Sequence, residues 1–215
     1  MAQRIADKFL SLMQRLVFEE NGVKFKASEL KFFMDPFFIL LEKIGYKFNV
    51  ISSNYLKLYY EIVKKELGML DVTSNSRILV IGGGALPVTT ALIAQHTKAK
   101  IVAIDKDIKS IDPAKNFIKQ LNLEKYITIK YADGLTFPVK DFDVIFILYG
   151  IKKPGEILKY ISESIDKNTK VIFRTIIDDK KISGELINIK DYFNILNNVK
   201  SKSLGSVDSF LLQKK

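Results

Sequence analysis

Apolar residues follow two different periods along the chain, and the period changes near residue 70. Before that point apolar side chains recur every three or four residues, as at Ile5, Phe9 and Leu12, which is the spacing of one face of an amphipathic helix. Glycines and an asparagine-glycine step interrupt the pattern and indicate helix ends. The predicted helices cover residues 3–19, 28–44 and 54–67.

After residue 76 short apolar runs alternate with helical stretches. Near-continuous apolar strands separated by helices are typical of a parallel sheet that is covered on both faces. The predicted strands are 77–81, 100–104, 126–131, 142–148 and 170–175, and the predicted helices are 87–96, 112–121 and 154–165. In the tail we expect a short helix over 191–197, then a hairpin of 200–204 and 209–213 that turns at Gly205-Ser206.

This pattern predicts an α/β protein with a Rossmann-like fold, in which a mostly parallel sheet ends in an antiparallel C-terminal hairpin. We assign residues 71–215 to this domain and residues 1–70 to an N-terminal helical segment that serves as a lid or accessory part.

The composition excludes several kinds of chemistry. The chain has no cysteine and a single histidine, His96, so disulfides, thiolate metal sites and a cysteine nucleophile are ruled out, and we predict no metal site. Charged residues interrupt the first apolar stretch and no apolar run is long enough to cross a bilayer. We therefore expect a cytoplasmic protein with no signal peptide and no membrane partner.

The net charge of +10 raises the question of nucleic acid. A basic surface attracts polyanions, but 30 of the 34 basic residues are lysines scattered along every segment. Arginine is the residue that usually dominates the recognition of phosphates and bases. We interpret the charge as a solvated lysine-rich surface and keep RNA binding as an alternative that is not favoured.

A triple glycine, Gly82-Gly83-Gly84, lies directly between the first predicted strand of the domain and the next helix. An open α/β sheet places its ligand crevice at this point. Glycines allow the backbone to approach a ligand closely, and the following helix presents unpaired N–H groups to it. A tight strand–helix turn without a ligand would also use glycine, so the loop needs support from other residues.

Two aspartates supply that support. Asp105 follows the second strand, 21 residues after Gly84, where an acid can accept hydrogen bonds from ribose hydroxyls. Asp133, within Ala132-Asp133-Gly134, follows the third strand, where an acid commonly contacts the adenine amino group in S-adenosylmethionine enzymes. Each aspartate alone could be a loop cap, but the three features together predict a nucleoside-containing cofactor.

The residues after the glycines argue against other nucleotide sites. The loop lacks the last glycine of G-x-G-x-x-G, and Pro87 stands in its place, which disfavours a nicotinamide cofactor. Pro87 can begin the helix, and Thr89 or Thr90 offers a hydroxyl to a ligand. No Gly-Lys-Ser/Thr follows, so a Walker loop is absent. The antiparallel hairpin also fits an S-adenosylmethionine transferase better than a dehydrogenase.

The run from Ile78 to Thr90, Ile-Leu-Val-Ile-Gly-Gly-Gly-Ala-Leu-Pro-Val-Thr-Thr, resembles the nicotianamine synthase family, whose glycine loop continues into Leu-Pro-x-Thr. Asn54-Tyr55-Leu56 resembles the family's Tyr-Leu segment, and Val171-Ile-Phe-Arg-Thr175 resembles its Arg-Thr. The similarity spans about residues 50–215. It implies a class I methyltransferase fold and transfer of the aminocarboxypropyl group of S-adenosylmethionine to an amine, with release of methylthioadenosine.

The resemblance also implies roles for individual residues. It gives Tyr55 as the tyrosine that takes a proton, together with a carboxylate for which Glu61 or Glu42 is a candidate. It gives Arg174 as a ligand-binding residue, although a structural salt bridge is an alternative. Tyr149 ends the fourth strand, where methyltransferases hold the acceptor, but it could equally line or support the cofactor pocket, as could Tyr131.

The predicted site residues fall into two groups. The catalytic candidates are Tyr55, Tyr149 and Glu61, and the cofactor-binding candidates are Gly82, Gly83, Gly84, Leu86, Pro87, Thr89, Asp105, Lys106, Asp133, Gly134, Tyr149 and Arg174.

Three functions remain open at this stage. The first is an aminocarboxypropyl transferase that acts on a small-molecule amine or amino acid. The second is a methyltransferase that acts on a small molecule, tRNA or protein. The third is a binding module that has kept the fold without the chemistry.

Overall fold

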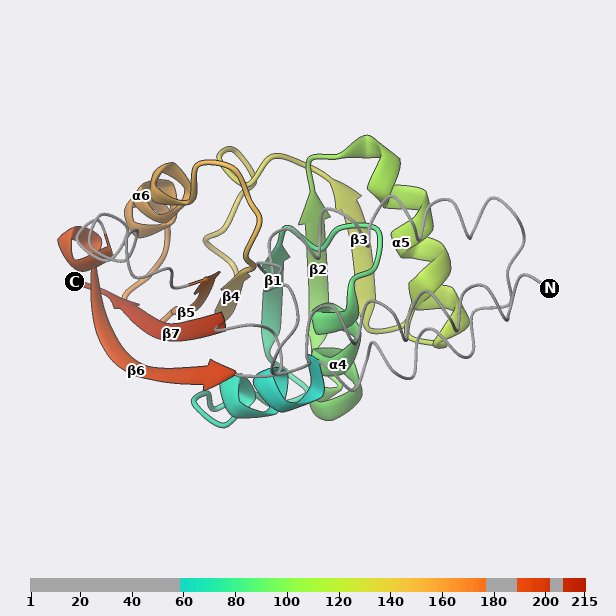
Figure 1. Ribbon diagram of the computed structural model, residues 1–215, viewed down its shortest axis with the longest axis horizontal. Coiled ribbons are helices and arrows are strands. Elements are labelled where there is room, and N and C mark those ends of the chain that lie inside the picture. The colour runs from blue at the N-terminus through green and yellow to red at the C-terminus, as the bar shows by residue number, and fades with distance from the viewer. Residues whose placement is uncertain (1–58, 177–188, 202–206) are drawn as a thin grey trace, which may run out of the picture.

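The computed structural model describes residues 59–176, 189–201 and 207–215 (Figure 1). The helices predicted over 3–19 and 28–44, the first part of the helix predicted over 54–67, and the turn at Gly205-Ser206 lie outside these residues. Tyr55 and Glu42 lie outside them as well.

The described residues form one seven-stranded sheet in the order β3-β2-β1-β4-β5-β7-β6. The first five of these strands are parallel, and β7 runs antiparallel to both β5 and β6. The strands are β1 (Arg77–Ile81), β2 (Lys100–Asp105), β3 (Ile127–Tyr131), β4 (Val144–Ile147), β5 (Lys170–Ile176), β6 (Phe193–Ser201) and β7 (Val207–Lys214). The chain order reverses between β1 and β4, where such sheets open a ligand crevice.

Helices cover both faces of the sheet because neighbouring strand residues point to opposite faces. In β1, Ile78 and Val80 belong to one buried cluster and Leu79 and Ile81 to the other. Helical residues 59–67, α4 (Val88–Thr97) and α5 (Ile108–Gln120) contribute to the first cluster. The second cluster contains residues of α6 (Pro154–Ser164), which lies across the sheet from α4 in Figure 1.

The predicted fold class is confirmed, and the five strands predicted between residues 77 and 175 agree with the observed ones to within a few residues. The first strand of the hairpin is predicted over 200–204, but β6 begins at Phe193. One helix begins earlier than expected. The pattern predicts a start at Asp112, but α5 begins at Ile108 because the Asp107 side chain caps it by accepting a hydrogen bond from the Lys109 N–H. Pro113 is accommodated within the helix.

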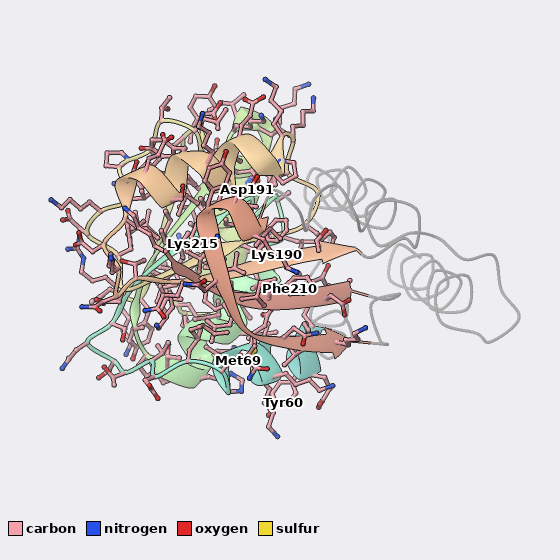
Figure 2. All side chains as sticks on the ribbon, turned by 90° about the vertical axis from the view of Figure 1, so that its left-hand side faces the viewer. Tyr60, Met69, Lys190, Asp191, Phe210 and Lys215 are labelled. Atoms are coloured by element: carbon pink, nitrogen blue, oxygen red, sulfur yellow. The ribbon has the colours of Figure 1, made fainter. Side chains whose placement is uncertain are left out.

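The predicted helix over 191–197 is wrong. Residues 189–192 are helical, and β6 begins at Phe193. Figure 2 shows the short turn at Lys190 and Asp191 running directly into β6, beside the strand that carries Phe210. A bulge between Ile195 and Asn197 shifts the register with β7. The bulge breaks the two-residue alternation of apolar and polar side chains that is typical of a strand, so the sequence pattern does not indicate one.

Helical residues 59–67 pack into the same core as the sheet, because Ile62 and Val63 belong to the cluster that contains Val80 and Phe146. The division of the chain at residue 70 stays a prediction. Within the described residues, no helix has the length and apolar character needed to span a membrane.

Candidate functional site

A cavity of about 500 Å³ opens at the carboxyl ends of the parallel strands, next to the point where the strand order reverses. It is lined by loops that follow β1, β2, β3 and β4. Six of the predicted cofactor-binding residues lie in this lining: Gly82, Gly84, Asp105, Lys106, Asp133 and Gly134. A cavity of this size can hold most of a nucleoside-sized ligand.

The glycine loop needs its glycines for two separate reasons. Gly82 and Gly84 adopt φ values of 86° and 68°, in the left-handed region that costs other residues about 1–2 kcal/mol. A Cβ atom on Gly82 would also lie 2.6 Å from the Ile151 Cγ2 atom. The loop is therefore packed against the segment after β4, with backbone rather than side chains facing the cavity.

Asp105 ties this loop to the second strand. Its Oδ2 atom accepts a hydrogen bond from the Gly84 N–H at 2.7 Å, and its Oδ1 atom accepts one from the Asp107 N–H at 2.9 Å. A carboxylate has about four acceptor positions, so these two bonds leave capacity for ligand hydroxyls. Asp105 thus shapes the loop at the same time as it lines the cavity.

Asp133 organises the loop after β3 in a similar way. Its Oδ1 atom accepts a hydrogen bond from the Leu135 N–H at 3.0 Å. A Cβ atom on the neighbouring Gly134 would lie 2.8 Å from Ile81 Cγ2, so this loop also needs a glycine in order to approach β1. The lining combines three carboxylates with Lys106 and Lys152, a mixture suited to a ligand with hydroxyl and amino donors.

The start of α4 is placed differently. Leu86, Pro87 and Thr89 are buried, and neither they nor Gly83 belong to the cavity lining. The Thr89 hydroxyl accepts a hydrogen bond from Arg174 Nη1 at 2.9 Å. The two residues are therefore brought together with each other, inside the protein, instead of lining the cavity described above.

Arg174 is the centre of a buried polar cluster that we call the Arg174 cluster, made of Glu66, Thr89, Arg174 and Ser209. Arg174 donates from Nε to Glu66 Oε1 at 2.9 Å and from Nη2 to Glu66 Oε2 at 2.6 Å. Ser209 donates to the same carboxylate. The ion-paired side chains of Arg174 and Glu66 are both fully buried. The salt bridge that the sequence left as an alternative for Arg174 is therefore present.

The charge of Arg174 is maintained in spite of this burial. Burial by itself lowers the pKa of the guanidinium, but the Glu66 carboxylate, with smaller effects of Tyr149 and Tyr59, raises that pKa above its ordinary value. A buried ion pair of this kind is costly to break, because removal of one partner leaves the other charge unpaired.

Two tyrosines adjoin the Arg174 cluster. The hydroxyls of Tyr59 and Tyr149 are hydrogen-bonded to each other, and the Arg174 guanidinium carbon lies 5.9 Å from the centroid of the Tyr59 ring. Tyr149 is buried in the turn after β4, and the next residue, Gly150, lines the cavity. The other candidates lie elsewhere, since Glu61 and Tyr131 are exposed.

Sequence reasoning missed Glu66 and Tyr59. A signal was present, because Tyr59, Ile62, Val63 and Glu66 follow the spacing of the apolar face of one helix. A carboxylate on such a face is buried when the helix packs, and it then needs a cation. In the folded chain that cation is Arg174, which is 108 residues away.

The described strand order, the antiparallel β7 and the glycine loop after β1 together define the class I methyltransferase fold. Among solved structures, the chain is similar to an RNA methyltransferase from Salinibacter ruber in complex with S-adenosyl-L-homocysteine. The TM-score is 0.57 at 14% identity, over 72% of this chain and 92% of that one.

The chain belongs to the nicotianamine synthase family, since the profile for nicotianamine synthase protein matches residues 4–215. Structures of MtNAS agree. A point mutant has a TM-score of 0.68 at 18% identity, over 87% of this chain and 71% of that one. MtNAS in complex with MTA and tNA gives the same TM-score and identity, over 88% and 71%. The family resemblance read from the glycine loop is thereby confirmed.

A curated relative is L-histidine 2-aminobutanoyltransferase from Yersinia pestis. It is 20% identical over 124 residues, which are 57% of this chain and 46% of the relative. The match therefore spans less than half the length of that protein.

Proposed function

We propose that this chain is an S-adenosylmethionine-dependent transferase that moves the aminocarboxypropyl group to the nitrogen of a small-molecule amine or amino acid. The observation that carries the proposal is the cavity at the glycine loop of a chain that belongs to the nicotianamine synthase family. The names of its relatives support it, because a point mutant of MtNAS has been solved in complex with S-adenosylmethionine and MtNAS in complex with MTA. The Yersinia relative is named for transfer to histidine.

The cavity residues supply the binding part of this function. In this proposal Asp105 accepts hydrogen bonds from the ribose hydroxyls and Asp133 accepts one from the adenine amino group, and both residues line the cavity. The glycine backbone of the loop allows the adenosyl part to approach β1, and a side chain at Gly82 would collide with Ile151. Lys106 adds a hydrogen-bond donor at the rim.

The reaction itself needs orientation and one proton acceptor. The amine nitrogen attacks the carbon next to the sulfonium sulfur, the carbon–sulfur bond breaks, and its electron pair stays on sulfur in methylthioadenosine. Because the leaving group is good, most of the acceleration comes from holding the amine in line, and a general base adds to it. Tyr149 directly precedes Gly150, which lines the cavity, and its catalytic role stays a prediction, as do those of Tyr55 and Glu61.

The product nucleoside tests this proposal. The full chain is incubated with S-adenosylmethionine and L-histidine, and the nucleoside products are identified by mass spectrometry. Methylthioadenosine is the expected product, together with histidine that carries an aminocarboxypropyl group. A panel of other amino acids and small amines extends the assay to different acceptors.

Two other results would replace the proposal. Release of S-adenosylhomocysteine alone identifies a methyltransferase, and a steep dependence of tRNA binding on salt concentration would then indicate an RNA substrate. If calorimetry detects no binding of S-adenosylmethionine, methylthioadenosine or S-adenosylhomocysteine, the chain is a module without this chemistry.

A further inference from the structure

The hydrogen-bonded pair of Tyr59 and Tyr149 is the part of the molecule that the binding site does not explain. Both residues are buried, each with 6% of its surface exposed, and their hydroxyls bond to each other across 90 residues of sequence. Burying two hydroxyls beside an arginine costs free energy, whereas a pair of apolar side chains would pack there without the cost of burying polar atoms.

The surroundings of the pair favour a negative charge on one of the oxygens. The Arg174 guanidinium carbon lies 5.9 Å from the Tyr59 ring centroid, and the guanidinium interacts electrostatically with both tyrosines. A phenolate on either tyrosine gains from this positive charge and from the hydrogen bond that the other hydroxyl donates.

The other groups of the Arg174 cluster also act on a phenolate at Tyr59 or Tyr149. Glu66, from the same helix as Tyr59, makes a phenolate less favourable because its carboxylate already pairs with Arg174. From α4 and β7 come the neutral hydroxyls of Thr89 and Ser209, which bond to Arg174 and to Glu66. Asp208 alternates with Ser209 along β7, so its side chain leaves from the opposite face of the sheet.

The position of the pair connects it with the cavity. Tyr149 follows β4 directly, and Gly150 and Ile151, the next two residues, line the cavity. Arg174 is on β5, the strand that pairs with β4 in parallel, close to its carboxyl end. The tyrosine pair therefore lies at the edge of the sheet at which the ligand cavity opens.

We propose that Tyr149 and Tyr59 act as one proton-accepting pair in the transfer reaction, and that Arg174 and Glu66 are positioning residues that hold this pair. The inference rests on the proposed transferase function. The ammonium group of the acceptor gives one proton to the Tyr149 phenolate, to which Tyr59 donates a hydrogen bond. The neutral amine then forms the nitrogen–carbon bond while the carbon–sulfur bond breaks, and Tyr149 returns its proton to solvent.

A spectroscopic titration tests the pair without any substrate. The chain contains nine tyrosines and no tryptophan, so the near-ultraviolet absorbance of phenolate reports on tyrosines with little interference. In the wild-type protein we expect one tyrosine to ionise at lower pH than the others. Tyr149→Phe and Tyr59→Phe should each abolish this early phase.

Tyr60→Phe is the matched control for both substitutions. Tyr60 is the neighbour of Tyr59 on the same helix, but it is 38% exposed and lies at the outer surface in Figure 2. The early phase should persist in Tyr60→Phe, since only a phenol outside the pair is lost.

Glu66→Gln adds a directional test, because it removes a negative charge while keeping a similar shape. The early ionisation should move to lower pH in this variant. Movement to higher pH, or absence of an early phase from the wild-type protein, overturns the inference.

Kinetics connect the pair with the reaction. Tyr149→Phe should lower kcat for methylthioadenosine release by about 100-fold, the usual size of a general-base contribution, with KM for S-adenosylmethionine within about twofold of wild type. Tyr59→Phe should lower kcat less, because it removes only the supporting hydrogen bond. Tyr60→Phe should leave both constants unchanged.

The two proposals fail in different ways. If the wild-type chain releases no methylthioadenosine with any acceptor, the transferase function is wrong. If methylthioadenosine is released but Tyr149→Phe keeps the wild-type kcat, the transferase stands and the proton-accepting pair is wrong.

Discussion

The cavity at the glycine loop and the Arg174 cluster both gather polar groups at the carboxyl end of the same sheet, yet they are built from different partners. In the cavity, Asp105 bonds to backbone N–H groups of the loops beside it. In the cluster, Arg174 and Glu66 bond to other side chains. The three carboxylates that line the cavity, on Asp105, Asp107 and Asp133, belong to half-buried or exposed residues, whereas the Arg174 cluster is closed to solvent.

This difference separates ligand binding from the support of the site. Backbone partners shape a loop and leave carboxylate oxygens available to a ligand. Side-chain partners in a closed cluster saturate one another. They join helical residues 59–67 and α4 to the paired strands β5 and β7. We therefore expect changes in the cluster to affect mainly stability and changes in the cavity to affect mainly affinity.

The largest effect is expected from breaking the buried ion pair. Glu66→Ala leaves the Arg174 charge without its carboxylate, which typically costs about 3–5 kcal/mol. The double variant Glu66→Leu with Arg174→Met removes both charges and should lose much less. Urea denaturation measures the free energy of unfolding of both variants. A loss of less than about 1 kcal/mol in Glu66→Ala, the usual contribution of an exposed ion pair, would contradict the structural role of the Arg174 cluster.

The next effect concerns the glycine loop. Gly82→Ala places a Cβ atom 2.6 Å from Ile151 Cγ2 at a residue with a φ of 86°, so we expect a loss of about 2 kcal/mol or more in stability. S-adenosylmethionine affinity should fall with it. Gly83→Ala is the stability control, because its Cβ atom would meet its nearest neighbour, Pro87 Cβ, at 3.7 Å. Equal melting temperatures for the two variants would contradict this account of the loop.

A smaller effect is expected at Asp105, and it should appear in affinity more than in stability. Asp105→Asn replaces one acceptor oxygen by an amide group that cannot accept both the loop N–H and a ribose hydroxyl. We expect about a tenfold loss of S-adenosylmethionine affinity, or about 1.4 kcal/mol, as measured by calorimetry. Asp112→Asn is the control, because that carboxylate is on the surface of α5 and pairs with Lys115 at 3.8 Å. An unchanged affinity in Asp105→Asn would remove Asp105 from the binding site.

The smallest effect is expected at Asp208, whose carboxylate is buried and lies 3.8 Å from the exposed Lys200 ammonium. Burial raises the pKa of Asp208, and Lys200 lowers it only in part. A carboxyl whose pKa is raised by folding destabilises the fold as pH rises through that pKa. Asp208→Asn should therefore be slightly more stable than wild type at pH 7, by about 1 kcal/mol or less.

The pH dependence provides the check on Asp208. Thermal unfolding at a series of pH values should show the advantage of Asp208→Asn shrinking towards about pH 3, where the carboxyl is protonated in both states. A variant that is less stable than wild type at pH 7 would mean that the Lys200 contact outweighs the cost of burial.

Much of the cavity could be predicted because its geometry is local. Asp105 ends a strand, and Gly82 and Asp133 follow strands. The ends of parallel strands meet at one edge of a sheet, so the positions of these residues in the sequence place them together. The helix predicted over 191–197 shows where local reading fails. Most of these residues form a strand instead, because they pair with β7. The bulge at Ile195 and Asn197 interrupts the alternation of apolar and polar side chains from which a strand would be predicted.

The sequence by itself determined the α/β class, the glycine loop and the family, because these depend on periodicity and on neighbours within one strand–loop–helix unit. Only the tertiary structure decided that Arg174 pairs with Glu66 and that Tyr149 pairs with Tyr59. Those partners are 108 and 90 residues apart, and no local preference links them. They meet because helical residues 59–67 bury their apolar face against the sheet, which carries a carboxylate and a phenol into the core.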